Sequence, residues 1–333
     1  MLIKKIVNDP RNVVPELLDG LVAAYGGRVR KLADVNAVVR TELQDGKVGV
    51  LLGGGSGHEP LFAGFVGEGL ADAAACGNVF AAPSPDTILA ATRAVNRGAG
   101  VLYVYGNYAG DVMNFDMAAE LAADEGIRVE TVRVWDDAAS APAARTQDRR
   151  GIAGDLFVIK IAGAVAASGA SLAEAHRVTS RARDATRSIG VAVAAGSIPE
   201  TGARTFELPD DAIEIGMGLH GEPGVSRERL LPADALVDRM LDVILPDLPF
   251  RGGDRVCLLV NDLGATTTME LLIVTRRAHQ ILRARDVRVQ DTLVGSFCTS
   301  QEMAGFSLSL LRLDPELERH WTRPAASLAL TRG

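Results

Sequence analysis

The chain alternates short β-rich runs with helical runs, and this alternation constrains the fold more than any other feature. Val48–Leu52 and Val101–Tyr105 are apolar runs of strand length, and each leads into a glycine-containing loop. Helical spacing characterises Asp86–Asn96 between them. Strands separated by helices are typical of βαβ units and of largely parallel sheets. The sequence therefore predicts an α/β fold with mostly parallel or mixed sheets flanked by helices.

The chain length indicates more than one domain. A chain of 333 residues corresponds to about two domains at roughly 150 residues each. A predicted helix ends near Gly190, so we expect an N-terminal α/β domain over residues 1–188 and a C-terminal α/β domain over 189–333. The second half opens with β-like runs, including Ala203–Leu208. The charged, alanine-rich stretch Asp136–Arg150 in the first half is typical of a surface loop.

The two halves share a local pattern. A strand, an Asn-x-x-Gly turn, a helix and a second strand occur at Asn107 and again at Asn261. An internal duplication and a chance similarity of βαβ units are both compatible with this pattern.

Composition excludes several classes of function. The formal net charge of −7 disfavours binding to a phosphate backbone, so we expect no nucleic-acid partner. No run approaches the ~20 apolar residues that span a bilayer, and the N-terminus lacks the apolar run of a signal peptide. The three cysteines show no CxxC spacing and are predicted to be buried, reduced thiols. These features predict a cytoplasmic protein without a membrane contact.

The glycine-rich segment Gly53–Pro60 is the first candidate binding loop. It follows a predicted strand and precedes renewed helical spacing, which is the usual position of ligand sites in open α/β sheets. A phosphate-binding P-loop would end in Gly-Lys-Ser/Thr, and Pro60 breaks the dinucleotide fingerprint. His58 in this loop could perform acid–base chemistry, or it could simply bind a backbone carbonyl.

Two further residues are candidates for chemistry. His220 lies among glycines in a predicted loop, where an accessible imidazole can act as base, nucleophile or metal ligand, or remain a surface residue. Asp111 is placed either to cap the following helix or to act at the carboxyl end of a strand. Without closely spaced histidines, a zinc site is not expected. Solvated helix faces account for the other three histidines, His176, His279 and His320.

Several ordered motifs together resemble one known family. They are Gly53-Gly54-Gly55-Ser56-Gly57-His58-Glu59-Pro60, Asn107-Tyr108-x-Gly110-Asp111, Gly218-x-His220-Gly221-Glu222-Pro223-Gly224, Asn261-x-Leu263-Gly264 and Cys298-Thr299-Ser300. From residue 3 to about 325 the chain resembles the dihydroxyacetone kinase K subunit.

The resemblance implies a division of roles among the site residues. A histidine at the place of His220 adds to the substrate ketone and forms a hemiaminal, while residues at the places of His58 and Asp111 hold the hydroxyls and supply a base. The substrate site implied by the resemblance consists of Gly55, Ser56, Gly57, His58, Gly106, Asp111 and His220.

The resemblance also implies partners. No cofactor or metal is expected on this chain, because ATP or ADP with magnesium binds to a separate nucleotide-binding L subunit. The phosphoryl donor is either ATP or a protein of the phosphotransferase system, and a homodimer is expected.

One position departs from the family pattern. Gly106 stands where many members carry a lysine, so a cation is lost and space opens beside the substrate. We therefore expect tolerance for a longer ketose such as erythrulose. A ketose-sensing co-activator of a transcription regulator is the alternative function, although retention of both His58 and Asp111 favours the kinase. A nicotinamide oxidoreductase is suggested by the glycine-rich turn alone, and Pro60 argues against it.

Overall fold

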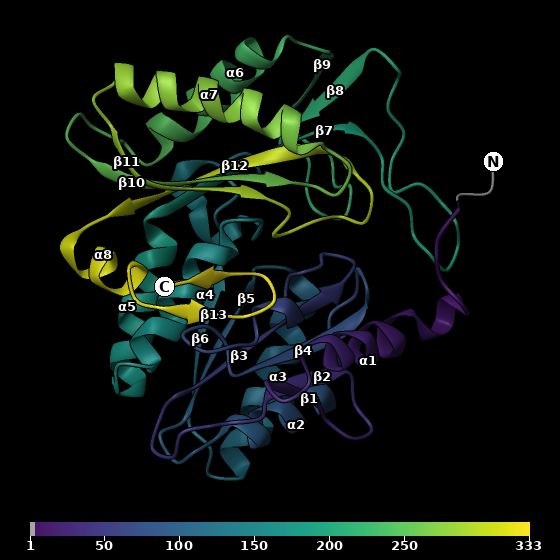
Figure 1. Cartoon of the computed structure of the whole chain (residues 1–333), viewed down its shortest axis with the longest axis vertical. Coiled ribbons are helices and arrows are strands. Elements are labelled where there is room, and N and C mark those ends of the chain that lie inside the picture. Colours follow the sequence, from purple (N-terminus) through teal and green to yellow (C-terminus); the bar gives the residue numbers. More distant parts are fainter. Residues whose placement is uncertain (1–3) are drawn as a thin grey trace.

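Two six-stranded mixed sheets organise the chain, and helices cover both of them (Figure 1). The computed structural model describes residues 4–333. Its strands are β1 (Val29–Lys31), β2 (Ala37–Arg40), β3 (Gly49–Ser56), β4 (Ala73–Val79), β5 (Val101–Gly106), β6 (Val129–Val134), β7 (Thr186–Ala194), β8 (Ala212–Ile215), β9 (Ser226–Arg229), β10 (Arg255–Asp262), β11 (Arg288–Gly295), β12 (Ala304–Leu313), β13 (Ala325–Ala326) and β14 (Thr331–Arg332). Its helices are α1 (Val13–Tyr25), α2 (Pro85–Val95), α3 (Ala109–Asp124), α4 (Asp155–Ala166), α5 (Leu172–Asp184), α6 (Ala233–Asp247), α7 (Thr268–Ala284) and α8 (Pro315–Trp321), with short 3-10 helices η1 (Pro10–Asn12), η2 (Ala63–Phe65) and η3 (Ala143–Asp148).

The first sheet has the strand order β1-β2-β4-β3-β5-β6. The four strands from β4 to β6 are parallel, whereas β1 and β2 pair antiparallel at one edge. Successive side chains alternate between the faces: Leu51 and Tyr103 join the core formed with α2 and α3, and Leu52 and Val104 join the core formed with α4. Burial on both faces explains why these strands are continuous apolar runs.

The second sheet has the strand order β11-β10-β12-β7-β8-β9, in which only the β10–β11 pair is parallel. Helices α6 and α7 cover one face (Figure 1). Leu259 and Leu311 on the other face belong to the same hydrophobic core as Leu52 of the first sheet. The two sheets thus share a core, with α4 and α8 between them (Figure 1). A division at residue 188 would fall inside β7, and we retain it as a proposal.

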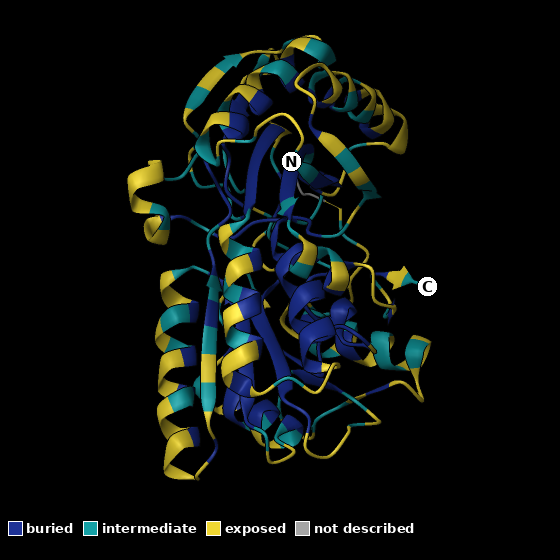
Figure 2. Cartoon of the chain, turned by 90° about the vertical axis from the view of Figure 1, so that its left-hand side faces the viewer, coloured by how far each residue is buried: buried dark blue, intermediate teal, exposed yellow. Residues whose placement is uncertain are grey.

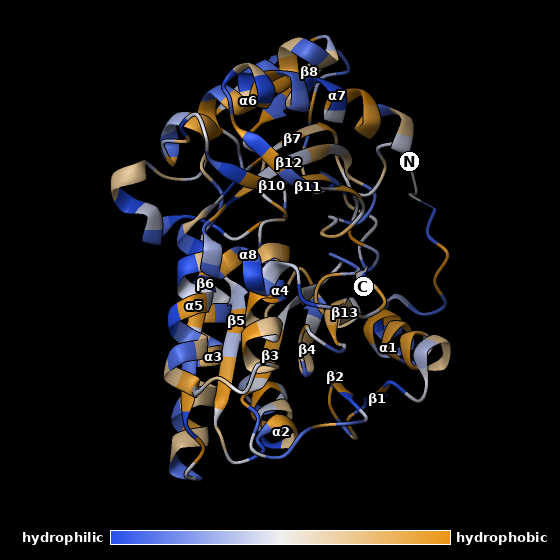
Figure 3. Cartoon of the chain, turned by 60° about the vertical axis from the view of Figure 1, so that its left-hand side comes forward, coloured by the Kyte–Doolittle hydropathy of each residue, from blue (hydrophilic) through white to orange (hydrophobic). Residues whose placement is uncertain are grey.

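The predicted α/β class with two mixed sheets and flanking helices is confirmed. The central strands are buried. Each outer helix has one buried face towards its sheet and one exposed face towards solvent (Figure 2). The same helices carry hydrophobic and hydrophilic stripes (Figure 3). The three cysteines are buried and free, as predicted. Within residues 4–333, no helix combines the length and apolar character that a membrane crossing requires.

The α-helix expected after Pro60 is wrong. Strand β3 continues through the glycines to Ser56, and only the 3-10 turn η2 follows before β4. A Cβ on Gly54 would lie 2.1 Å from the Phe62 ring, so the missing side chain lets this short turn fold back against the strand. The predicted strand Ala203–Leu208 is also wrong, since this largely exposed segment makes only an isolated bridge at Arg204.

The surface-loop prediction for Asp136–Arg150 is wrong in part, because Asp136, Asp137 and Arg149 are fully buried. The Asp136 carboxylate accepts hydrogen bonds from the backbone N–H groups of Ile152 (2.8 Å) and Gly154 (2.9 Å). These bonds satisfy the buried carboxylate and fix the chain just before α4.

Candidate active site

Residues from both sheets meet at one small pocket. His58 lies two residues beyond β3, Asp111 lies in the first turn of α3 after β5, and His220 lies in the loop after β8. Since β3 and β5 are neighbouring parallel strands, their carboxyl ends share one edge of the first sheet. Gly55 and Gly106 line the same pocket. Five of the seven predicted site residues thus come together.

The remaining two predicted residues, Ser56 and Gly57, lie beside the pocket rather than in its lining. The Ser56 hydroxyl donates to the Gly77 carbonyl at 2.7 Å, and the Gly57 N–H donates to the Glu59 carboxylate at 3.0 Å. Gly57 has φ +100°, which favours glycine. These contacts hold the loop that presents His58, and a direct contact with substrate stays a prediction.

His58 is buried, with 3 % of its surface exposed. Its Nδ1 lies 2.8 Å from the Thr299 carbonyl oxygen. A carbonyl can only accept, so Nδ1 carries the proton and Nε2 of the neutral ring presents a lone pair. Burial, followed by the charge of His220, lowers the pKa of His58 to about 3, against the Thr299 hydrogen bond, which raises it. His58 therefore stays neutral at physiological pH.

Glu222 orients His220. The His220 Nδ1 lies 3.0 Å from Glu222 Oε1, and the His220 backbone N–H donates to Glu222 Oε2 at 2.9 Å. Burial raises the pKa of Glu222, but the hydrogen bond and charge of His220 outweigh it and lower that pKa to about 2. The ionised carboxylate thus fixes a proton on Nδ1 and turns Nε2 towards the pocket.

The two histidines face each other. Nε2 of His220 lies 3.1 Å from Nε2 of His58, and the rings meet edge to face at 4.9 Å between centroids. Because both Nδ1 atoms are committed to oxygen partners, the Nε2 contact is a hydrogen bond only when it holds one additional proton. The Tyr108 ring packs edge-on against His220 at 4.8 Å. With both rings neutral, the two Nε2 atoms present their lone pairs to the pocket.

Asp111 is nearly buried, with 9 % of its surface exposed. The predicted capping role is wrong, since Tyr108 is the N-cap of α3 and Asp111 lies in the first turn without a side-chain cap bond. Its Oδ1 finds no hydrogen-bond partner among the described residues. Burial raises the pKa of Asp111 to about 7, although the charge of His220 acts in the opposite direction. Such a carboxyl can take up a proton near neutral pH.

The other histidines lie elsewhere. His320 was predicted to be solvated, and this is wrong because its side chain, on the buried face of α8, is only 6 % exposed. His176 and His279 are partly exposed, as expected for helix faces. No group of three or more His, Cys, Asp or Glu within residues 4–333 is arranged to hold a metal ion.

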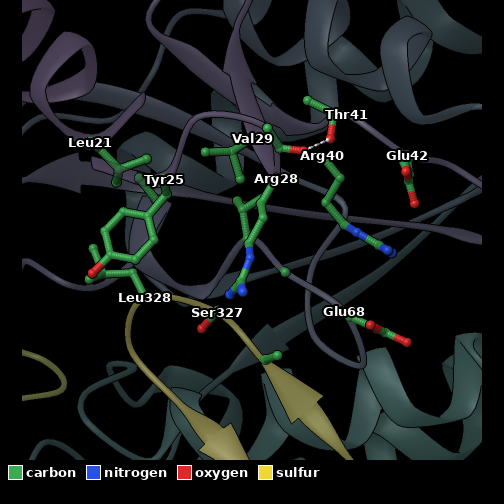
Figure 4. A pocket seen from close by; sticks show the side chains of 15 residues that line it. Leu21, Tyr25, Arg28, Val29, Arg40, Thr41, Glu42, Glu68, Ser327 and Leu328 are labelled. Atoms are coloured by element: carbon green, nitrogen blue, oxygen red, sulfur yellow. Dashed lines mark hydrogen bonds between the residues drawn. The ribbon is translucent and has the colours of Figure 1, made fainter. Parts of the chain in front are cut away.

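A larger hollow lies away from these residues, between α1, the end of β2 and the C-terminal segment (Figure 4). Tyr25, Arg28, Arg40, Glu68 and Leu328 are among its lining residues. It contains none of the predicted site residues. We assign the candidate active site to the smaller pocket, because that pocket joins two histidines with a buried carboxyl.

Two residues that line the pocket, Tyr108 and Asp155, and one that contacts His220 from behind it, Glu222, were not assigned a role from the sequence. Glu222 belongs to the motif Gly218–Gly224, but its hydrogen bond to His220 could be recognised only in the folded structure. Tyr108 stood in another motif without a role. Asp155 gave no signal in the sequence, because an acidic residue at a helix start is common.

The fold and the pocket together define the class of protein. It is a two-sheet α/β protein whose pocket offers a nucleophilic group and acid–base groups. The chain belongs to the family described as Dak1 domain, whose model matches residues 19–329.

Two curated relatives are similar along nearly the whole chain. The "PTS-dependent dihydroxyacetone kinase 2, dihydroxyacetone-binding subunit DhaK" of Listeria innocua is 45 % identical over 317 residues, covering 95 % of either chain. The "L-erythrulose kinase" of Pectobacterium atrosepticum is 42 % identical, covering 98 % of this chain and 56 % of the relative. This chain therefore spans little more than half of that longer protein.

Two solved structures share the fold. The dihydroxyacetone kinase of C. freundii matches with a TM-score of 0.91 and 35 % identity, covering 99 % of this chain and 60 % of that one. A structure described as "Dihydroxyacetone kinase operon co-activator Dha-DhaQ" matches with a TM-score of 0.91 and 30 % identity, covering 96 % of this chain and 99 % of the other.

Proposed function

We propose that this chain is the substrate-binding subunit of a dihydroxyacetone-type kinase, which captures a short ketose as a hemiaminal on His220. The Nε2–Nε2 contact of 3.1 Å between His220 and buried His58, backed by Glu222, carries the proposal. A ligand that inserts between the two rings meets the nucleophilic Nε2 of His220 and the Nε2 of His58, which can accept or donate a proton. The names of the Listeria innocua and C. freundii proteins support this substrate class.

The capture step balances with one proton. The Nε2 lone pair of His220 forms a bond to the ketone carbon while the carbon–oxygen π bond breaks. A proton taken up from solvent is relayed through His58 Nε2 to the ketone oxygen, so a hydroxyl forms and His58 is neutral before and after the step. His220 becomes a substituted imidazolium, and its positive charge is paired with the Glu222 carboxylate 3.0 Å away. The total charge is unchanged.

Asp111 is proposed to act in the second step. Its unpartnered Oδ1 can accept the hydrogen of the captured substrate's terminal hydroxyl, and the carboxylate takes that proton as the oxygen bonds to phosphorus. A pKa of about 7 matches the operating pH of such a base. Positioning by the covalent bond to His220 supplies the remaining requirement of phosphoryl transfer.

We propose that a separate L subunit binds ATP or ADP with magnesium and docks at this pocket. The donor is ATP or a phosphotransferase-system protein, and the name of the Listeria innocua relative favours the latter. We also propose a cytoplasmic homodimer.

Two alternatives have specific support. The match to an operon co-activator supports ketose sensing, for which capture by His220 would suffice and a base at Asp111 would have no use. The similarity to an L-erythrulose kinase, together with Gly106, supports a four-carbon substrate.

The test of capture uses dihydroxyacetone labelled with ¹³C at C2. We expect the C2 resonance to leave the carbonyl region for that of a tetrahedral carbon in the presence of the protein, and to stay unchanged with His220→Ala. Persistence of an unshifted C2 signal with the folded wild-type protein would overturn the proposal. Capture without phosphorylation, in the presence of an L subunit and donor, would favour the sensor.

A further inference from the structure

A second carboxyl group lines the pocket and plays no part in the mechanism above. Asp155 opens α4 and is 2 % exposed. Its Oδ1 is buried and has no hydrogen-bond partner among the described residues. It shares the pocket with Asp111 and His220. A buried, unpartnered polar atom in a pocket wall calls for a ligand group that satisfies it.

A structural role does not account for Asp155. The N-cap of α4 is Gly154, and no side chain makes a cap bond there. An acid in the first helical turn gains only a small stabilisation from the helix dipole. Burial of a polar group without a hydrogen bond costs more than this gain. The balance is unfavourable unless a bound molecule supplies the missing partner.

The backbone holds Asp155 firmly in place. Its N–H donates to the Ile152 carbonyl at 3.0 Å. The Asp136 carboxylate binds the N–H groups of Ile152 and Gly154 on the same turn. A carboxyl anchored in this way is preorganised for recognition.

Gly106 keeps the approach to Asp155 open. A Cβ on Gly106 would lie 3.5 Å from Asp155 Oδ2 and 3.4 Å from the Tyr108 ring, which is ordinary contact. Any longer side chain would enter the space between that ring and the carboxyl. A Cβ on Gly151 would lie 2.6 Å from the Gly106 Cα and 3.1 Å from Asp155 Oδ1, so the two glycine backbones pack closely beside the carboxyl. The opening beside Asp155 therefore exists because residue 106 has no side chain.

We infer that Asp155 is a specificity-determining residue whose carboxyl group binds the hydroxyl on the fourth carbon of a ketotetrose, in the space beside Gly106. This inference rests on the proposed function. The two histidines serve the carbonyl carbon and its oxygen, and Asp111 serves the hydroxyl that is phosphorylated. The added hydroxymethyl group of a ketotetrose needs space and a hydrogen-bond partner. Gly106 leaves the space, and Asp155 provides the hydrogen-bond partner.

The protonation state suits this role. Burial, followed by the charges of Asp136 and Asp111, raises the pKa of Asp155 well above its usual range. A protonated carboxyl both donates and accepts, as a hydroxyl partner requires. Asparagine has the same shape and also offers a donor and an acceptor, which makes it the matched control.

The experiment measures dissociation constants of dihydroxyacetone and of D- and L-erythrulose by calorimetry on the full chain, with adduct formation followed by ¹³C NMR. For the erythrulose enantiomer that binds better, Asp155→Ala should weaken binding about tenfold, as expected for loss of one good hydrogen bond. Binding of dihydroxyacetone should change less than about threefold. Asp155→Asn should keep both affinities within about threefold, and Gly106→Ala should weaken erythrulose selectively.

The outcomes separate the two proposals. A wild-type protein that captures neither ketose overturns the proposed function, and the role of Asp155 fails with it. Capture of dihydroxyacetone without erythrulose overturns only the role of Asp155. So does an equal loss of both ligands with Asp155→Ala, or unchanged affinity for both. Because the substitution removes an unpartnered carboxyl, the variant should unfold no earlier than wild type, and Asp155→Asn provides a second folded variant.

Discussion

Replacement of Asp111 by asparagine should stabilise the fold while it removes phosphorylation. Asp111 is nearly buried, its Oδ1 is unpartnered among the described residues, and burial raises its pKa from 3.8 to about 7. A raised pKa means that the folded protein binds this proton more tightly than the unfolded chain does. The stability associated with Asp111 is therefore complete below about pH 4 and is lost as the pH rises through 7.

The magnitude follows from the size of the shift. A difference of about 3 pKa units at 1.36 kcal/mol each gives about 4 kcal/mol of destabilisation above pH 7. Against this, the wild-type carboxylate in the first turn of α3 gains about 0.3–1 kcal/mol from the helix dipole. The cost of burying the charge exceeds the gain from the helix dipole. Asp111→Asn should therefore raise the free energy of unfolding by about 3 kcal/mol at pH 8. The gain should vanish near pH 4.

The assay is urea denaturation of both proteins from pH 4 to pH 8, with the difference in midpoint multiplied by their common m value. Capture of labelled dihydroxyacetone is measured on the same samples and should survive in Asp111→Asn, whereas phosphorylation with an L subunit should be lost. A stability gain that does not depend on pH, or a less stable variant at pH 8, would refute the reasoning. Glu130→Gln, at an exposed position of strand β6, is a control variant, and its stability should differ little from that of the wild type.

Three further predictions follow from the same contacts. Phosphorylation should fall about tenfold per pH unit below pH 7, because Asp111 must be deprotonated to act as base; a flat profile between pH 5 and 7 would contradict this. Glu222→Gln should weaken capture of labelled dihydroxyacetone about tenfold or more in NMR titrations, since the imidazolium of the adduct loses its paired charge, and unchanged capture would rule out that role. Asp247→Asn should lower the free energy of unfolding by about 3–5 kcal/mol in thermal or urea melts, because Arg149 and Arg187 would remain buried without their carboxylate; a loss below 1 kcal/mol would contradict it.

The regular elements could be predicted where one periodicity dominated. Helix α2 followed from the helical spacing of Asp86–Asn96, and its Ile88 and Leu89 are buried. Strand β5 followed from five consecutive apolar residues. The extension of β3 through Gly53, Gly54 and Gly55 could not be foreseen, because glycine is rare in strands and common in loops.

The tertiary structure explains those strand glycines. A Cβ on Gly53 would lie 2.6 Å from the Phe115 ring, and one on Gly55 would lie 2.8 Å from the Ala81 backbone nitrogen. Side chains and backbone from distant segments press against the strand, and hydrogen bonding to β4 and β5 keeps it extended. The low strand propensity of glycine is therefore overridden by tertiary contacts, which cannot be recognised from the neighbouring sequence.

In the candidate site, too, some positions could be predicted from the sequence and others could not. His58 and Asp111 each follow a predicted strand, so their presence at one sheet edge could be predicted from topology alone. The arrival of His220 from the second sheet could not, and only the family resemblance implied it. The loop after β11 makes this meeting possible: the Thr299 carbonyl accepts from His58, and the Ser300 hydroxyl donates to the Leu219 carbonyl beside His220.

Asp136 and Asp155 show which buried acids need a functional explanation. Asp155 is the first residue of α4, and Asp136 accepts hydrogen bonds from the backbone just before that helix. Burial raises the pKa of both carboxyl groups. Asp136 receives two backbone hydrogen bonds, so the fold itself accounts for its presence. Asp155 Oδ1 receives none from the described residues and lies in the pocket wall. If folding alone had set both residues, an apolar side chain would serve better at position 155, so the acid there is best explained by a polar ligand.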